Sequence, residues 1–298
     1  MVNAAWTFPG QGSQRVGMGR DAAEQSDDAR RVFDRVDDAL GFRLSDIVFN
    51  GPAEELVATS VQQPAILAAS VAHYVALREA GKLPEPAFVA GHSLGEYSAL
   101  VAAGSLDIAD AARLVRRRGE LMEEHGLGGM VAVIGLDGDK LVEIADQSGV
   151  EIANFNAPGQ TTLSGRSENL ERASELAKDA GARRVLPLPV NGAFHSSLMQ
   201  PVAQALWTDL QQVELRSPIA PMLANVDARA LSDPDDLRAE LRDHITASVQ
   251  WISIIEGAGA AGVDTFYEVG PGKVLSGLAP RIIKGCQTHH AEQLLAEA

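Results

Sequence analysis

The sequence contains one cysteine, Cys286, in 298 residues. A single thiol cannot form a disulfide within the chain or supply a cluster of cysteine ligands to a metal ion. The sequence also has no H-E-x-x-H motif, so we expect no metal centre. Scarcity of cysteine fits a reducing compartment, and we expect the protein to be cytoplasmic.

Basic residues and long apolar runs are scarce as well. The chain has 25 Lys and Arg against 40 Asp and Glu, a net charge of −15. Because nucleic acids and anionic membranes attract basic surfaces, we expect this chain to bind neither. The most apolar stretches, near 61–77 and 86–106, are interrupted by polar residues and fall short of the roughly 18 apolar residues of a membrane span. Residues 1–11 do not have the pattern of a secretory signal.

Short apolar runs alternate with longer helical patterns, which is typical of an α/β protein. We predict a large subdomain with a parallel sheet over residues 1–126 and 190–298. Its predicted strands lie at 4–8, 86–91, 222–226 and 263–269, and predicted helices include 62–77, 108–124 and one that starts at Leu94.

The middle of the chain, residues 127–189, has a different order of predicted strands and helices. The pattern predicts β-α-β-β-α-β, which is the order of a ferredoxin-like unit inserted into the larger subdomain. Its predicted strands are 130–136, 150–155, 161–164 and 183–188, and its predicted helices are 140–147 and 168–180. The alternative is that this segment continues the larger α/β pattern.

The pentapeptide Gly91-His92-Ser93-Leu94-Gly95 has the pattern G-x-S-x-G between a predicted strand and a predicted helix. In that context the glycines permit a sharp turn that presents the serine at a helix N-terminus. Free N–H groups and the helix dipole there favour a developing negative charge, as the oxyanion of a serine-based reaction requires. Ser93 is therefore the candidate nucleophile. The alternative is that Ser93 only caps the helix.

A serine nucleophile needs a base, and His195 is the candidate among seven histidines. It follows a predicted strand and precedes a predicted helix, the place where α/β active sites form. Without Ser93, an ordinary loop histidine would be the alternative. The other histidines have structural interpretations: His92 points away from its neighbour Ser93, His73 lies in the buried helix, His125 ends a helix, His244 lies on a charged helix, and His289 and His290 lie in a polar C-terminal tail.

Arg118 lies on the apolar face of an amphipathic helix. At about 100° per residue, the apolar side chains of 108–124 occupy one half of the helix, and Arg118 is the only charged residue in that half. A buried guanidinium is strongly unfavourable unless it is paired. Its partner is either an acidic residue elsewhere in the fold or a bound carboxylate, which arginine grips with two hydrogen bonds.

These residues, with further motifs, resemble the malonyl-CoA–acyl carrier protein transacylases and the acyltransferase domains of polyketide and fatty acid synthases. The resemblance extends from about residue 4 to 284 and follows the order of the family's motifs. The motifs are FPGQGSQ at 8–14, QQP at 62–64, GHSLGEY at 91–97, RG at 118–119, NFN at 154–156, GAFH at 192–195, VQW at 249–251 and EVGPG at 268–272.

The resemblance implies a large subdomain like that of α/β-hydrolases, a ferredoxin-like small subdomain, and a Ser-His dyad. Ser93 would be the nucleophile and His195 the general base. A backbone carbonyl near Gln250, rather than an acidic side chain, would orient the histidine. The N–H groups of Gln11 and Leu94 would form the oxyanion hole.

The resemblance also implies how the substrate binds. Arg118 would hold the carboxylate of the malonyl group, and Gln63, Asn154 and Gln250 would line the pocket. Phe194 is similar to the malonyl-type signature, and its ring would crowd an α-methyl group. A desolvated arginine would also reject acetyl-CoA, since the guanidinium would be left unpaired.

The implied reaction is ping-pong transfer. The serine takes the malonyl group from malonyl-CoA, and the phosphopantetheine thiol of an acyl carrier protein then takes it from the serine. The resemblance implies no bound cofactor; malonyl-CoA takes part as a substrate. The expected partners are a coenzyme A thioester and an acyl carrier protein, and the expected state is a monomer. Fatty acid synthesis and polyketide synthesis in trans both remain open.

Two other functions remain as alternatives. An esterase or thioesterase would need an acidic residue between Ser93 and His195 placed against the histidine. The aspartates in that interval fall in the predicted small subdomain, which is a poor location. The second alternative is a non-catalytic module that docks a carrier protein, for which Ser93 would be dispensable.

Overall fold

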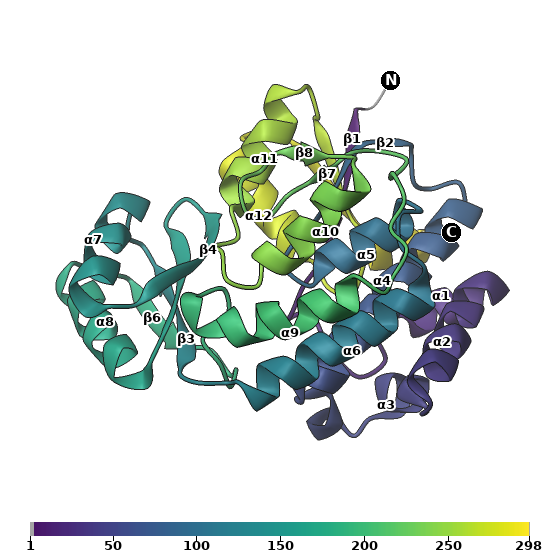
Figure 1. Ribbon diagram of the computed structural model, residues 1–298. Coiled ribbons are helices and arrows are strands. Elements are labelled where there is room, and N and C mark those ends of the chain that lie inside the picture. The colour runs from purple at the N-terminus through teal and green to yellow at the C-terminus, as the bar shows by residue number, and fades with distance from the viewer. Residues whose placement is uncertain (1–2, 298) are drawn as a thin grey trace.

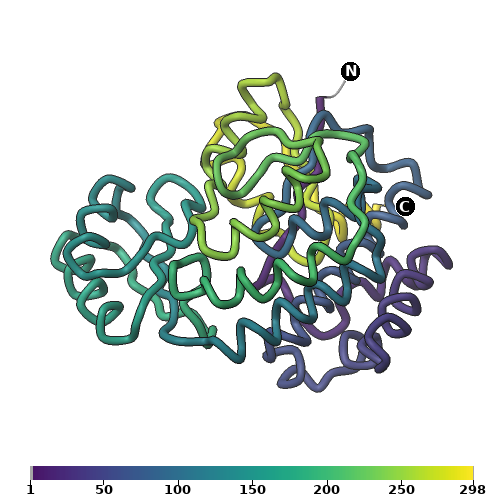
Figure 2. The backbone as a smooth tube through the Cα atoms, viewed as in Figure 1, coloured from purple at the N-terminus to yellow at the C-terminus, as the bar shows by residue number. Residues whose placement is uncertain are grey.

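The computed structural model describes residues 3–297, which form two β-sheets surrounded by helices (Figures 1 and 2). The strands of the larger sheet are β1 (Ala4–Phe8), β2 (Pro86–Gly91), β7 (Met222–Leu223), β8 (Ala230–Leu231), β9 (Thr265–Glu268) and β10 (Gln287–His290). Their order is β10-β9-β1-β2-β7-β8. Neighbouring strands are parallel except β7 and β8, which are antiparallel.

Helices cover both faces of this sheet. In β1, Trp6 and Phe8 pack into the core formed with α4 and α6, whereas Ala5 points into a second core formed with α11 and α12. Among residues 3–297, no helix combines the length and the apolar character needed to cross a membrane. The helices of this part are α1 (Arg20–Gln25), α2 (Asp27–Leu40), α3 (Leu44–Asn50), α4 (Thr59–Glu79), α5 (Gly95–Ala102), α6 (Ile108–Glu124), α9 (Gln200–Leu210), α10 (Pro234–Asp243), α11 (Trp251–Ala260), α12 (Val274–Ile282) and α13 (Ala291–Ala296).

The smaller sheet belongs to the teal lobe at the left of Figure 1. Its elements are β3 (Gly129–Ile134), α7 (Gly138–Ser148), β4 (Glu151–Ala157), β5 (Gln160–Gly165), α8 (Ser167–Asp179) and β6 (Arg184–Pro187). The strand order is β4-β5-β3-β6 and every pairing is antiparallel, which is the ferredoxin-like arrangement. The alternative of a continued large sheet is therefore wrong. The residue boundaries predicted for the two subdomains stay predictions.

One prediction about the C-terminal region is wrong. His289 and His290 do not lie in a tail, because residues Gln287–His290 form β10 and pair in parallel with Thr265–Glu268. The segment has no apolar alternation that would indicate a strand, and it lies at the edge of the sheet. The helices α1 to α3 are additional to the predicted elements, and the strand predicted at 222–226 is only two residues long.

The contact of α6 with α4 is close because α6 contains Gly119. A Cβ atom built at Gly119 would lie 2.6 Å from the Cα atom of Ser60. That distance is shorter than real Cβ contacts, so glycine is required for the two helices to approach. The preceding residue on α6 is Arg118, and the same contact therefore sets how deeply Arg118 is buried.

Gly119→Ala is expected to lower the free energy of unfolding by about 1–3 kcal/mol, because the added methyl group forces α6 away from α4. Gly257→Ala is the matched control. Gly257 is also a helical glycine, but a Cβ atom there would meet nothing within 4 Å. Alanine at that position should raise stability by about 0.5–1 kcal/mol. Urea unfolding measures both variants, and equal effects would contradict the close approach.

Candidate active site

Ser93 lies in the turn between β2 and α5, as the G-x-S-x-G pattern predicts. Its φ angle is +52°, in the left-handed region that non-glycine residues rarely adopt. A Cβ atom at Gly91 would lie 1.9 Å from the carbonyl carbon of Gly95, and one at Gly95 would lie 2.1 Å from the carbonyl oxygen of Phe8. Both glycines are therefore required where β1, β2 and α5 meet. The N–H group of Ser93 donates to Asn225 Oδ1 at 2.7 Å.

The structure brings His195 to Ser93. Ser93 Oγ lies 2.8 Å from His195 Nε2. His195 Nδ1 lies 2.7 Å from the carbonyl oxygen of His244 and 3.1 Å from that of Ala247. Because Nδ1 holds the proton for these acceptors, Nε2 is free to accept the serine proton. The orienting carbonyl expected near Gln250 is thus supplied by His244 and Ala247, which precede Gln250 in the chain.

Burial keeps the His195 ring neutral. Burial lowers the pKa of His195 well below its ordinary value, and the neighbouring His244 and Arg118 act in the same direction. A lowered pKa leaves the imidazole able to accept a proton near pH 7. Among residues 3–297, no carboxylate contacts this ring, so the site lacks the acidic third member that the hydrolase alternative requires.

Arg118 reaches Ser93 from α6 and is fully buried. Its Nη1 donates to Gln63 Oε1 at 2.8 Å, and its Nη2 donates to Ser93 Oγ at 3.0 Å. Its Nε has no hydrogen-bond partner, and in the described part of the chain no carboxylate forms an ion pair with it. The predicted alternative of a structural salt bridge is therefore not found. A buried guanidinium without an anionic partner, beside a nucleophile, is suited to receive a substrate carboxylate.

A cavity of about 180 Å³ opens onto Ser93 and His195. Of the residues predicted to bind the substrate, Asn154 and Phe194 line it, and so does Gln11, which is predicted for the oxyanion hole. Arg118 and Gln63 are not among the lining residues and are bonded to each other next to Ser93. Gln250 is not among the lining residues; its N–H group donates to the carbonyl oxygen of Asn225 at 2.8 Å. The lining residues are Gln11, Gly12, Gln14, Gln62, His92, Ser93, Met130, Asn154, Leu188, Pro189, Val190, Phe194 and His195.

The two N–H groups predicted for the oxyanion hole are available to a ligand. Between residues 3 and 297, the backbone N–H groups of Gln11 and Leu94 donate to no protein acceptor. Leu94 directly precedes α5, so its N–H group lies at the positive end of that helix. Unpaired N–H groups beside a nucleophile are what an oxyanion requires, and this role stays a prediction.

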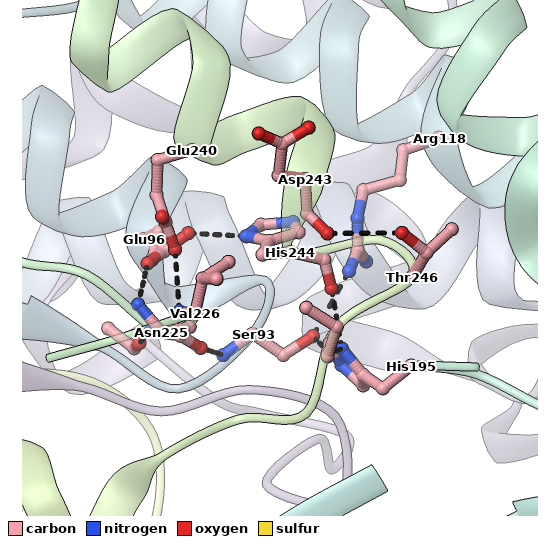
Figure 3. A network of polar contacts seen from close by, with 12 residues as sticks. Ser93, Glu96, Arg118, His195, Asn225, Val226, Glu240, Asp243, His244 and Thr246 are labelled. Carbon is pink, nitrogen blue, oxygen red and sulfur yellow. Dashed lines mark hydrogen bonds and ion pairs between the residues drawn. The ribbon is translucent and has the colours of Figure 1, made fainter. Parts of the chain in front are cut away.

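A group of buried ionisable side chains lies behind Ser93 and His195 (Figure 3). Glu96, Glu240 and His244 each offer a ligand atom, and these atoms lie within 4.8 Å of one another, a spacing that could hold a metal ion. Hydrogen bonds already account for them. Glu96 accepts the N–H group of Asn225 at 2.9 Å, Glu240 accepts that of Val226 at 3.0 Å, and His244 Nδ1 contacts Glu96 Oε2. We therefore assign no metal to this group.

Sequence reasoning missed this group. The sequence places His244 on a charged helix; in the structure it directly follows the charged helix α10 and is fully buried. One feature of the sequence indicates a buried charge here. Glu96 is the only charged residue of the apolar helix α5, and it is the residue directly after the G-x-S-x-G motif. The interpretation of His92 is consistent with its contact, since its Nε2 lies 2.8 Å from Asn156 Oδ1.

Comparison with known proteins gives the family. The chain matches the acyl transferase domain family over residues 5–287. It is 43% identical over 296 residues to the malonyl CoA-acyl carrier protein transacylase of Bacillus subtilis (strain 168), which covers 97% of this chain and 93% of that protein. The chain belongs to the malonyl-CoA–acyl carrier protein transacylase family. It is 45% identical over 291 residues to the same protein of Escherichia coli (strain K12), which covers 95% of this chain and 94% of that one.

Solved structures of the family have the same fold. The acyl-carrier-protein-S-malonyltransferase from Bartonella henselae is 45% identical, with a TM-score of 0.95 and coverage of 99% of this chain and 98% of that one. A malonyl-transacylase in complex with a type II PKS acyl-carrier protein is 38% identical, with a TM-score of 0.94 and coverage of 99% and 100%. The predicted fold class and the predicted class of enzyme, an acyltransferase, are confirmed.

The carboxyl pair behind the site links stability to pH. Burial raises the pKa of Glu240 to about 9, with repulsion from Glu96 acting in the same direction, and burial raises the pKa of Glu96 to about 8. Up to about pH 8 the folded protein therefore holds a proton on each carboxyl group, whereas the unfolded chain releases both near pH 4.5. The stabilisation is full below that pH and is lost as the pH rises toward 8–9.

Glu240→Gln is expected to remove the part of this pH dependence that comes from Glu240. Relative to the variant, the wild-type protein should lose up to about 1.4 kcal/mol of unfolding free energy per pH unit between about pH 5 and pH 8, because the variant lacks one of the two retained protons. Urea unfolding at several pH values measures the difference. Glu256→Gln, at an exposed position on α11, is the control and should follow the wild type. Parallel curves for Glu240→Gln and the wild type would show that Glu240 holds no extra proton.

Proposed function

We propose that this chain transfers a malonyl group from malonyl-CoA to the phosphopantetheine thiol of an acyl carrier protein through a malonyl-serine intermediate. One observation carries the proposal: Ser93 Oγ lies 2.8 Å from His195 Nε2 and 3.0 Å from Nη2 of the buried Arg118, which forms no ion pair with a carboxylate of residues 3–297. A base and a carboxylate-binding group therefore meet at one nucleophile. The names of the relatives, which describe malonyl transfer to acyl carrier protein, agree with it.

The first half-reaction acylates the serine. Ser93 Oγ attacks the thioester carbonyl carbon, and His195 Nε2 takes the hydroxyl proton. The negative charge on the carbonyl oxygen would be stabilised by the N–H groups of Gln11 and Leu94. When the carbon–sulfur bond breaks, the thiol of coenzyme A leaves with the proton from His195. The histidine is then neutral again.

The second half-reaction repeats these steps with another thiol. His195 takes the proton of the phosphopantetheine thiol, and the sulfur attacks the malonyl ester. Ser93 leaves and recovers its proton. Each step needs only the nucleophile, the base and N–H donors of the chain itself, so we propose that no cofactor takes part. The monomeric state and the cytoplasmic location stay predictions.

Arg118 gives the site its preference for an acyl group with a free carboxylate. In the proposed complex the malonyl carboxylate accepts hydrogen bonds from the guanidinium, which Gln63 holds in place at 2.8 Å. An acetyl group would leave the guanidinium unpaired in a buried site. Phe194, which lines the cavity near Ser93, would crowd a branched acyl group.

The test is formation of the acyl-enzyme. Incubation with malonyl-CoA alone should add one malonyl group to Ser93, detected by intact-protein and peptide mass spectrometry, and addition of phosphopantetheinylated carrier protein should discharge it. Ser93→Ala should lose the adduct and at least about 10³-fold of the transfer rate. Ser98→Ala, a buried serine of α5 outside the cavity, is the control and should acylate normally.

Two other outcomes would contradict the proposed function. Release of free malonate without discharge to the carrier protein would support the hydrolase alternative. Transfer by Ser93→Ala at the wild-type rate would contradict a serine intermediate.

A further inference from the structure

The carboxyl group of Glu96 contacts two residues, one that hydrogen-bonds to Ser93 and one that hydrogen-bonds to His195. Glu96 Oε1 accepts the backbone N–H group of Asn225 at 2.9 Å, and Glu96 Oε2 contacts Nδ1 of His244 (Figure 3). Glu96 lies in the first turn of α5, just after Ser93, and is fully buried. The carboxyl group therefore joins α5 to two segments that are distant in sequence.

The Asn225 contact supports the nucleophile. Asn225 Oδ1 accepts the N–H group of Ser93 at 2.7 Å, and Asn225 Nδ2 donates to the carbonyl oxygen of Gly91 at 2.6 Å. The same side chain thus holds both sides of the turn in which Ser93 has a positive φ angle. Since a strained backbone persists only where surrounding contacts fix it, the position of Asn225 determines the position of Ser93.

The His244 contact supports the base. The carbonyl oxygen of His244 accepts from His195 Nδ1 at 2.7 Å, and His195 also has a positive φ angle, +57°. The ring of His244 is fully buried, and its Nε2 has no partner within residues 3–297. Glu96 is therefore the hydrogen-bond partner that fixes this ring, and with it the residue whose carbonyl orients His195.

Glu240 completes the arrangement from α10. Its carboxyl group lies beside that of Glu96, with an oxygen atom of each within 4.8 Å of the other, and it accepts the N–H group of Val226 at 3.0 Å. Burial raises the pKa of both carboxyl groups, so the two lie together without the repulsion of two full negative charges. Glu240 thus packs against Glu96 and leaves the two oxygen atoms of Glu96 in contact with Asn225 and His244.

We propose that Glu96 is a positioning residue for the transfer reaction, which holds Ser93 through Asn225 and His195 through His244. The proposal rests on the proposed function, in which Ser93 is the nucleophile and His195 the base. Glu96 touches neither the substrate cavity nor the reacting atoms, so it acts on the rate through geometry. Errors of about 1 Å in such geometry lower rates by about 10²-fold.

The experiment compares two substitutions of His244. His244→Ala removes the contact with Glu96, and His244→Gln keeps a side-chain N–H donor. His244→Ala should lower kcat for malonyl transfer to carrier protein by about 10- to 100-fold and leave KM for malonyl-CoA within about threefold. In the free enzyme, His244→Ala should also broaden or remove the proton NMR signal of His195 Nδ1–H. This signal is assigned by its absence from the spectrum of His195→Ala. His244→Gln should restore most of the rate and the signal.

Glu96→Gln gives an independent comparison at the other end of the contact, with the same fall in kcat expected. The control is His73→Ala, which removes another fully buried histidine, one that contacts Asp21 at 3.0 Å, and should leave kcat and the His195 signal unchanged. A wild-type rate and signal in His244→Ala, or equal defects in His244→Ala and His244→Gln, would overturn the proposal. If the proposed function is wrong, Ser93→Ala will still transfer the malonyl group. The NMR signal would then still test whether His244 positions His195, because it does not depend on the reaction.

Discussion

The buried charge of Arg118 is the constraint around which the site is organised. Its guanidinium has no exposed surface and no carboxylate partner among the described residues, and it donates to Gln63 and Ser93 instead. Leaving a charge in this state is unfavourable, and a substrate carboxylate would relieve it. Binding energy and acyl selectivity would thus come from the same unpaired group. The close contact of α6 with α4 at Gly119 holds this charge in the interior.

The reacting pair depends on backbone that is itself held under strain. Ser93 and His195 both have positive φ angles, and each is fixed by a hydrogen bond from outside its own segment. The partner of Ser93 is a side chain, Asn225, and the partner of His195 is the carbonyl group of His244. A carbonyl acceptor orients the ring without adding negative charge beside it, so burial lowers the pKa of His195 unopposed by an anion.

Local signals in the sequence were sufficient for much of the fold and for the reacting pair. The G-x-S-x-G turn predicts Ser93 because a strand must end and a helix must begin within a few residues. Arg118 is predicted by helical periodicity alone, because a charge on an apolar face is visible without knowledge of the fold. The ferredoxin-like unit follows from the order of its strands and helices.

What could not be predicted depends on contacts between distant segments. The carbonyl group that orients His195 belongs to His244, and no sequence pattern shows which loop reaches a histidine in space. The buried role of His244 and the link from Glu96 to Asn225 depend on α10 and β7 packing beside α5. Gln63 was expected in the pocket, but α4 places it one layer behind, against Arg118. The edge strand β10 has a polar sequence, so only its pairing with β9 shows it.

The most direct test of the central claim is a crystal structure of the enzyme after exposure to malonyl-CoA, with the malonyl group attached to Ser93. We expect the malonyl carboxylate to lie against Arg118, with both oxygens about 2.7–2.9 Å from guanidinium nitrogens. A malonyl-serine whose carboxylate points to the mouth of the cavity, with Arg118 bonded only to protein groups, would contradict this role of Arg118.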